Sequence, residues 1–107
     1  MVDVNGLQID GKTEDVMPTE PLDEKFAAFG WNVVKCDGHD FDQLREAFQK
    51  ACVKNGKPSV ILLKTVKGKG VSYMEGDPQW HGKAPGEELF LQGEQELKAK
   101  IAELEGK

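Results

Sequence analysis

The sequence predicts an α/β fold built on a parallel sheet, of which this chain carries only a part. Two strand-like segments and a third, shorter one are separated by segments with helical periodicity. Crossovers of that length give parallel strands with right-handed connections. The run from Val60 to Leu63 is entirely apolar, which is typical of a strand covered on both faces. Because such sheets need neighbours around their central strands, we expect this sheet to be incomplete.

The first elements are a strand stub, a turn and a helix. Residues 2–4 form the stub, and the Asn5-Gly6 pair that follows marks a tight turn. A polar loop is expected over residues 10–18. Start signals at residues 19–21 then predict a helix whose apolar positions are Leu22, Phe26 and Phe29. Gly30 ends this helix.

The middle of the chain predicts a strand, a helix and a second strand. Residues 31–36 alternate and are closed by the turn Asp37-Gly38. Asp40 is the expected N-cap of the next helix, and Gln43 completes a capping box. Residues 59–63 form the covered strand. The apolar stripe expected on the helix consists of Phe41, Leu44, Phe48, Ala51 and Cys52.

The carboxyl-terminal part predicts a long loop and a helix. Residues 66–86 hold five glycines and two prolines without a helical or strand period, a composition and length typical of functional loops. Residues 87–107 are expected to form an amphipathic surface helix with Leu97, Ile101 and Leu104 on one face.

Charge and composition exclude several classes of protein. A net charge of -5 argues against non-specific binding to nucleic acid or to anionic membranes. The longest apolar run is far shorter than the ~20 residues that span a bilayer, and the start lacks a signal sequence, so we expect a cytoplasmic protein. Cys36 and Cys52 lack the spacing of a redox pair or zinc site, which predicts reduced, buried thiols.

The turn at residues 3–11 presents polar side chains and backbone carbonyls after a strand. Magnesium takes oxygen ligands, typically one or two protein groups together with phosphate oxygens and water, and an Asn side chain with a nearby carbonyl would suit it. On the turn alone, an ordinary bend that uses Asn and Gly for its backbone geometry is the better interpretation.

Five blocks stand out at residues 3–11, 17–22, 29–31 with 37–40, 64–70 and 80–85. In the same order along the chain, they resemble the diphosphate-binding domain of transketolase. The resemblance is closest to the amino-terminal subunit of split, two-chain transketolases, and it implies a three-layer parallel-sheet thiamine diphosphate-binding fold. It makes residues 1–107 the carboxyl-terminal portion of that domain, a partial domain, with residues 66–86 as its active-site loop.

The resemblance also implies roles for individual residues. It places Asn5 and the Leu7 carbonyl as ligands of Mg²⁺ against the cofactor diphosphate, and Ile9 against the cofactor between its two rings. His81 would be the catalytic residue, steadying the intermediate by hydrogen bonding or proton transfer. Without the resemblance, His81 would be interpreted as a surface-loop histidine.

The implied activity is transfer of a two-carbon ketol unit between sugar phosphates, with thiamine diphosphate and Mg²⁺ as cofactors. The family's acidic metal ligand lies in a Gly-Asp-Gly motif that is absent from this sequence, in which four residues precede Asn5. We therefore expect these residues alone to bind cofactor weakly or not at all and to be inactive. The partners implied are the upstream part of the domain and a carboxyl-terminal transketolase subunit, in an oligomeric complete enzyme.

Two alternative functions stay open. A fragment of 1-deoxyxylulose 5-phosphate synthase would share several blocks, although residues 80–85 favour transketolase. A non-catalytic remnant or interaction module is the alternative from another class. Among the remaining polar and aromatic residues, His39 is interpreted as part of a turn, Lys69 as a substrate contact, Trp31 as core, and Trp80 as core or site lining.

Overall fold

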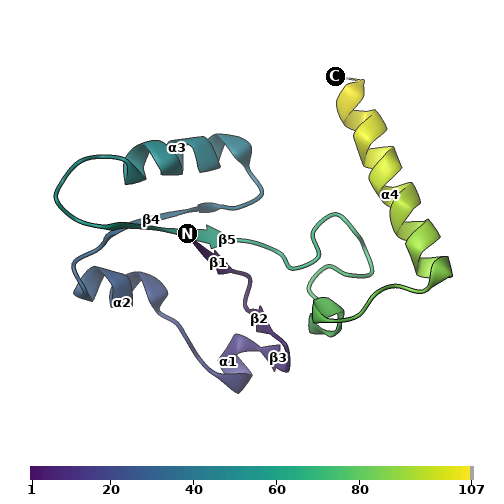
Figure 1. The fold of residues 1–107 in the computed structure, drawn as a ribbon, viewed down its shortest axis with the longest axis horizontal. Coiled ribbons are helices and arrows are strands. Elements are labelled where there is room, and N and C mark those ends of the chain that lie inside the picture. Colours follow the sequence, from purple (N-terminus) through teal and green to yellow (C-terminus); the bar gives the residue numbers. More distant parts are fainter. Residues whose placement is uncertain (107) are drawn as a thin grey trace. The chain divides into compact units, whose positions relative to one another are not determined.

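The computed structural model describes residues 1–106, which divide into two compact units (Figure 1). The first unit contains Met1–Gly6 and Lys12–Thr65. The second contains Leu7–Gly11 and the described residues from Val66 onward. Each unit has its own packing.

A three-stranded parallel sheet forms the first unit. Its strands are β1 (Val2–Val4), β4 (Asn32–Asp37) and β5 (Ser59–Lys64), in the order β1-β5-β4. Val4 and Asp37 both pair with Lys64, so the three strands end at the same edge of the sheet. The predicted α/β fold with a parallel sheet is confirmed.

Two helices connect these strands. The chain crosses from β1 over to β4 through α2 (Leu22–Ala28) and returns to β5 through α3 (Phe41–Ala51). Because right-handed crossovers in opposite directions place their helices on opposite faces, α2 and α3 lie on the two sides of the sheet (Figure 1). α2 packs on β4, and α3 packs on β4 and β5.

The core of this unit is the central strand. Val60, Ile61 and Leu62 are 3%, 5% and 6% exposed, which confirms the prediction of a strand covered on both faces. The stripe predicted on α3 is wrong in part, because Phe41 is 87% exposed and the buried residue is Ala47. A small side chain is thus the buried one on the helix that packs on β4 and β5, and Phe48 is also exposed, at 47%.

Caps and turns fix the helices of the first unit. As predicted, the Asp40 carboxylate accepts hydrogen bonds from the backbone N–H groups of Asp42 (2.9 Å) and Gln43 (3.1 Å). The Gln43 amide does not close the expected capping box. It accepts from the Asp37 N–H (3.1 Å) and donates to Asp40 Oδ2 (2.9 Å), which ties the end of β4 to α3. Gly30, with φ 82°, follows α2 as predicted.

Two single-residue expectations in this unit are wrong. Cys52 is exposed because it follows the last turn of α3, whereas Cys36 is half-buried. Burial raises the pKa of the Cys36 thiol, and the nearby carboxylates of Asp37 and Asp40 raise it further. Trp31 is 36% exposed rather than buried, since it precedes β4 and packs edge-on against Phe26, with ring centroids 5.3 Å apart.

The residues after the first turn are more ordered than expected. Instead of a polar loop from residue 10, β2 (Leu7–Gln8) and β3 (Gly11–Lys12) form a two-stranded sheet, followed by the one-turn helix α1 (Thr13–Val16). Positive φ values at Gly6 (73°) and Gly11 (142°) permit this tight path. Strands of two residues are too short to show alternation in the sequence.

The second unit consists of a long loop and a helix. Within the predicted loop, Pro78–His81 form a short 3-10 helix, η1, which Asp77 caps by accepting from the Gln79 N–H (2.9 Å). The predicted helix is present as α4 (Glu87–Glu105), and residue 107 lies outside the described residues. Within residues 1–106, no helix has both the length and the apolar character needed to cross a membrane.

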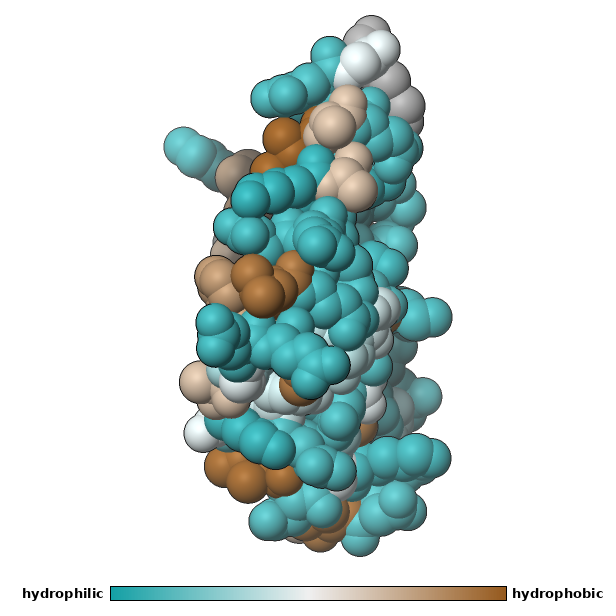
Figure 2. Space-filling model, turned by 90° about the vertical axis from the view of Figure 1, so that its right-hand side faces the viewer, coloured by the Kyte–Doolittle hydropathy of each residue, from teal (hydrophilic) through white to brown (hydrophobic). Residues whose placement is uncertain are grey.

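The apolar face predicted on α4 stays open. Leu97, Ile101 and Leu104 are 46%, 54% and 59% exposed, as is Phe90 at 56%. In the space-filling view, apolar residues form separate patches among hydrophilic ones (Figure 2).

Candidate functional site

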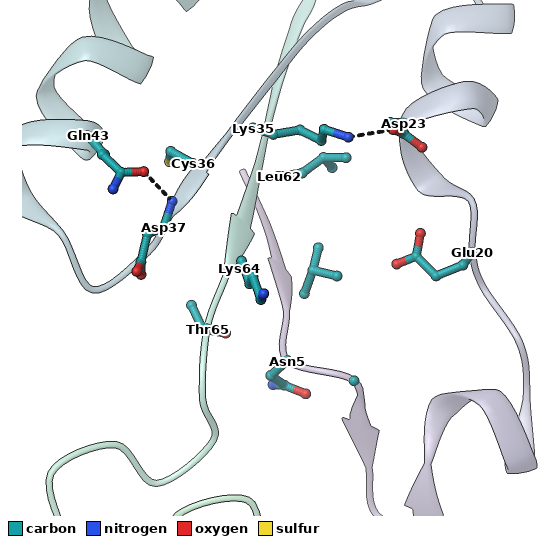
Figure 3. Close-up of a pocket in the computed structure, with 12 residues that line it drawn as sticks. Asn5, Glu20, Asp23, Lys35, Cys36, Asp37, Gln43, Leu62, Lys64 and Thr65 are labelled. Carbon is teal, nitrogen blue, oxygen red and sulfur yellow. Dashed lines mark hydrogen bonds and ion pairs between the residues drawn. The ribbon is translucent and has the colours of Figure 1, made fainter.

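A cavity of about 720 Å³ lies at the carboxyl ends of the strands of the first unit (Figure 3). Asn5 and Gly6 follow β1, Asp37 ends β4, and Lys64 and Thr65 come at the end of β5. Open parallel sheets bind ligands outside the carboxyl ends of their strands, because the turns there diverge and expose backbone and polar groups. The remaining lining residues are Val4, Glu20, Asp23, Lys35, Cys36, Gln43 and Leu62.

Two of the charged side chains that line this cavity form an ion pair. Lys35 Nζ lies 2.8 Å from Asp23 Oδ2, which links β4 to α2 (Figure 3). The hydrogen bond from Lys35 lowers the pKa of the Asp23 carboxyl, and the Glu24 N–H adds to the effect. The same hydrogen bond raises the pKa of Lys35. No sequence pattern indicates this pair, since its members are separated by a helix and a turn.

Asn5 is half-buried where the chain leaves β1. The Thr65 N–H donates to the Val4 carbonyl (3.4 Å), and the Thr65 hydroxyl donates to the Asp3 carboxylate. These contacts fix the end of β1 to the end of β5. Gly6 then turns the chain with a positive φ, so Asn5 is held at the cavity wall by both of its neighbours.

The turn after β4 follows Asp37, which lines the cavity, and it is tied to the end of β5. The Gly38 N–H donates to the Lys64 carbonyl (2.8 Å), and Asp37 Oδ1 accepts from the His39 N–H (2.8 Å). A Cβ on Gly38 would lie 2.5 Å from Thr65 Cγ2, so only glycine fits at this approach. The interpretation of His39 as part of a turn is confirmed by its backbone contact. The close packing that requires Gly38 has no signature in the sequence.

Leu7, Ile9 and His81 belong to the second unit. There β2, which begins at Leu7, contacts η1, which ends at His81, so the structure brings two elements with predicted site residues together. Ile9 lies between β2 and β3 and is 65% exposed, and the His81 side chain is also exposed. Asn5 and Leu7 are two residues apart in the sequence but belong to different units.

Trp80 anchors η1 to the preceding loop. Its indole Nε1 donates to the Tyr73 carbonyl (2.9 Å), and the two rings meet edge-on with centroids 5.2 Å apart. Lys83 Nζ lies 5.5 Å from the Trp80 ring centroid, within range of a cation–π contact. Trp80 is thus a half-buried structural contact beside the exposed His81.

The oxygen donors of the opening turn suit part of a magnesium site. The Asn5 amide oxygen and the Leu7 carbonyl are neutral oxygen ligands of the kind that Mg²⁺ accepts. Residues 1–106 contain no group of three or more His, Cys, Asp and Glu side chains that would hold a metal ion.

The parallel sheet has a crevice at its carboxyl edge, lined by charged and polar residues and by a larger share of apolar surface, and a glycine-rich loop follows its central strand. This arrangement is typical of ligand-binding α/β domains. The chain belongs to the transketolase family: the family described as "Transketolase, thiamine diphosphate binding domain" matches residues 1–101.

Known relatives support this assignment. The chain is 46% identical over 103 residues to a 6-deoxy-6-sulfo-D-fructose transketolase subunit of Clostridium sp. (strain MSTE9), covering 96% of this chain and 35% of the relative. It is 38% identical over 105 residues to an apulose-4-phosphate transketolase subunit of Phocaeicola vulgatus, covering 98% of this chain and 37% of the relative. The chain thus spans about a third of these relatives' length.

Solved structures agree with the fold. Transketolase from Campylobacter jejuni superposes with a TM-score of 0.77 and 33% identity, over 88% of this chain and 15% of that chain. Transketolase from Leishmania mexicana has a TM-score of 0.62 over 97% of this chain and 19% of that chain, and at 24% identity it supports the fold alone.

Proposed function

We propose that this chain supplies part of the thiamine diphosphate and magnesium site of a transketolase that moves a two-carbon ketol unit between sugar phosphates. The observation that carries the proposal is the position of Asn5, which lines the cavity at the carboxyl edge of the sheet within the family-matched residues 1–101. The relatives are named as transketolase subunits, which supports a partner subunit for this chain.

In the proposed site, the Asn5 amide oxygen and the Leu7 carbonyl hold magnesium. Thiamine diphosphate, when bound, supplies the electron sink for cleavage of the carbon–carbon bond. Ile9 offers an apolar, exposed side chain to the cofactor. These residues bind and orient, and they provide no group for proton transfer.

The proposed proton-handling residue is His81. Its imidazole can donate and accept hydrogen bonds and is exposed on η1, which supports a role at a hydroxyl of the sugar donor. We assign residues 66–86 as the active-site loop because they carry η1. The Asn5 amide and the Leu7 carbonyl are both neutral, so the proposed metal site also needs a carboxylate, which the rest of the domain would supply. Residues 1–107 alone are therefore proposed to be inactive.

The test is an Asn5→Ala substitution in the complete enzyme, assembled with its partner subunit. We expect magnesium-dependent cofactor binding, measured by calorimetric titration, to weaken at least about tenfold, in line with the loss of a metal ligand. Asn55→Ala is the matched control, because Asn55 lies in an exposed turn and accepts only from the Lys57 N–H (3.0 Å) among the hydrogen bonds resolved for its side chain. Equal binding by the two variants would refute the metal role.

Product analysis of the same enzyme separates the remaining functions. Exchange of a two-carbon unit between sugar phosphates is the expected result. Pyruvate-dependent synthesis of deoxyxylulose phosphate would replace the transketolase assignment with the synthase. Micromolar cofactor binding by residues 1–107 alone would contradict the proposal that this part is inactive for want of a carboxylate.

A further inference from the structure

One face of α4 receives the loop that leads to η1. Leu89, Gln92, Gly93 and Glu96 occupy positions i, i+3, i+4 and i+7 and therefore share a face of the helix. Loop residues 71–73 contact this face through hydrogen bonds to Leu89, Gln92 and Glu96 and through close approach to Gly93. The face differs from the apolar one predicted from Leu97, Ile101 and Leu104.

Glu96 binds Ser72 with both carboxylate oxygens. Oε2 accepts from the Ser72 N–H (2.7 Å), and Oε1 accepts from the Ser72 hydroxyl (2.6 Å). Gln92 Nε2 donates to Glu96 Oε1 (2.9 Å) and to the Ser72 hydroxyl oxygen (3.3 Å). Hydrogen bonds to a carboxylate are shorter and stronger than those between neutral groups. The Ser72 hydroxyl, then the Ser72 N–H, then Gln92 lower the pKa of Glu96.

Tyr73 is seated beside the next turn of the helix. Its hydroxyl donates to the Leu89 carbonyl (2.8 Å), and a Cβ on Gly93 would lie 3.0 Å from the same hydroxyl oxygen. Glycine is less favourable than alanine inside a helix, so its presence at this buried position needs a reason. The reason is room for Tyr73.

The contacts continue from Tyr73 to His81. Trp80 donates to the Tyr73 carbonyl and packs edge-on against its ring. The Gly76 N–H donates to the Lys67 carbonyl (2.9 Å) and closes the loop of residues 67–76, which contains Tyr73. His81 is the residue after Trp80 and the last of η1. A continuous series of contacts thus joins α4 to the residue before the histidine.

We propose that Glu96 is a positioning residue. It binds Ser72 to α4 and thereby fixes the position of Tyr73, which contacts Trp80. Trp80 in turn holds η1, and with it His81, in place for the substrate. The inference rests on the proposed function of His81. Glu96 contacts the loop and acts through it, which predicts an effect on the chemical step rather than on binding.

The first test is Glu96→Gln in the complete enzyme. A glutamine keeps the shape but is neutral and has only one acceptor oxygen, so one of the two charge-assisted bonds from Ser72 is replaced at most by a weaker donation from the amide to the hydroxyl oxygen. We expect faster hydrogen exchange at residues 71–81, and a fall in kcat on the order of tenfold with little change in KM, since small misplacements of a reacting group are costly. Glu94→Gln is the control, because Glu94 pairs with Lys98 (2.9 Å) on the same helix, and it should leave both quantities unchanged.

A second substitution tests the contact between Tyr73 and Gly93 without weakening the helix. Gly93→Ala favours α4 but pushes its Cβ against the Tyr73 hydroxyl, so we expect kcat to fall while the melting temperature holds or rises. This variant keeps the inference testable if Glu96→Gln fails to fold. A kcat equal to that of the unchanged enzyme would overturn the inference.

His81→Asn separates this inference from the proposed function. If His81→Asn loses activity while Glu96→Gln exchanges faster but keeps full kcat, the positioning role of Glu96 is wrong and the role of His81 stands. If His81→Asn retains full activity, the proposed role of His81 fails, and the contact of Glu96 with Ser72 has no catalytic purpose.

Discussion

The contacts that stabilise the interior of the first unit differ in kind from those that stabilise the second. In the first, the central strand buries Val60, Ile61 and Leu62 between its neighbours and two helices. In the described part of the second, Gly93 is the one buried residue, and hydrogen bonds from Ser72, Tyr73 and Trp80 fix the loop. One unit is stabilised by apolar burial and the other by a few directed polar contacts.

This difference predicts that separate sets of residues determine the stability of the fold and the position of η1. Apolar burial is graded, because each removed carbon costs a share of the transfer free energy and leaves a cavity. A directed contact depends on single atoms, because one missing acceptor or one added carbon displaces its partner. The first unit should therefore govern whether the chain folds, and the second should govern where η1 is held.

The largest expected effect is in the central strand. Ile61→Ala should lower the free energy of unfolding by about 2–5 kcal/mol, because the site is surrounded and cannot collapse fully. Urea denaturation followed by circular dichroism measures the change. Val53→Ala, at a position 59% exposed, should change it by less than about 0.5 kcal/mol. Similar losses in the two variants would mean that β5 is not the core.

A smaller effect tests a single-atom contact inside the first unit. Gly38→Ala places a Cβ 2.5 Å from Thr65 Cγ2 and 3.2 Å from Leu63 Cβ, which should cost about 1–3 kcal/mol and distort the cavity edge. Gly82→Ala is the control, since nothing lies within 4 Å of its Cβ position. If the two variants unfolded at the same urea concentration, the close approach at Gly38 would not matter.

The sequence was most informative where local pattern and burial act together. The strands β1, β4 and β5, the helices α2 and α3 and the Asp40 cap were predicted because periodicity and capping are local properties. The order β1-β5-β4 was not predicted, since strand pairing joins distant residues. Neither was the choice of Ala47 over Phe41 as the buried residue of α3, because it depends on how closely that helix approaches the sheet.

The candidate site also contains features that the sequence predicted and features that it did not. Asn5 was predicted through the family resemblance, and it lines the cavity. The metal and cofactor roles of Asn5, Leu7 and Ile9, and the catalytic role of His81, stay predictions. The contacts of Glu96 with Ser72 were missed because 24 residues separate them and neither residue stands out among its polar neighbours.

The smallest expected effect is the loss of stability at acid pH that comes from Asp40, and the substitution Asp40→Asn should reduce it. The Gln43 N–H and side chain, and then the Asp42 N–H, lower the pKa of Asp40 below its ordinary 3.8. Its stabilising contribution is therefore complete above pH 3.8 and is lost as the pH falls through the lowered pKa.

Asp40→Asn keeps a capping oxygen but cannot titrate, so stability at pH 7 should change little while the loss on acidification shrinks. Urea denaturation at pH 7 and in steps below pH 4 measures both. Glu96→Gln, whose parent carboxylate also has a lowered pKa, should reduce the acid sensitivity of loop exchange at residues 71–81 and leave the unfolding of the sheet unchanged. If Asp40→Asn altered loop exchange, or Glu96→Gln altered unfolding of the sheet, the two units would not be stabilised separately.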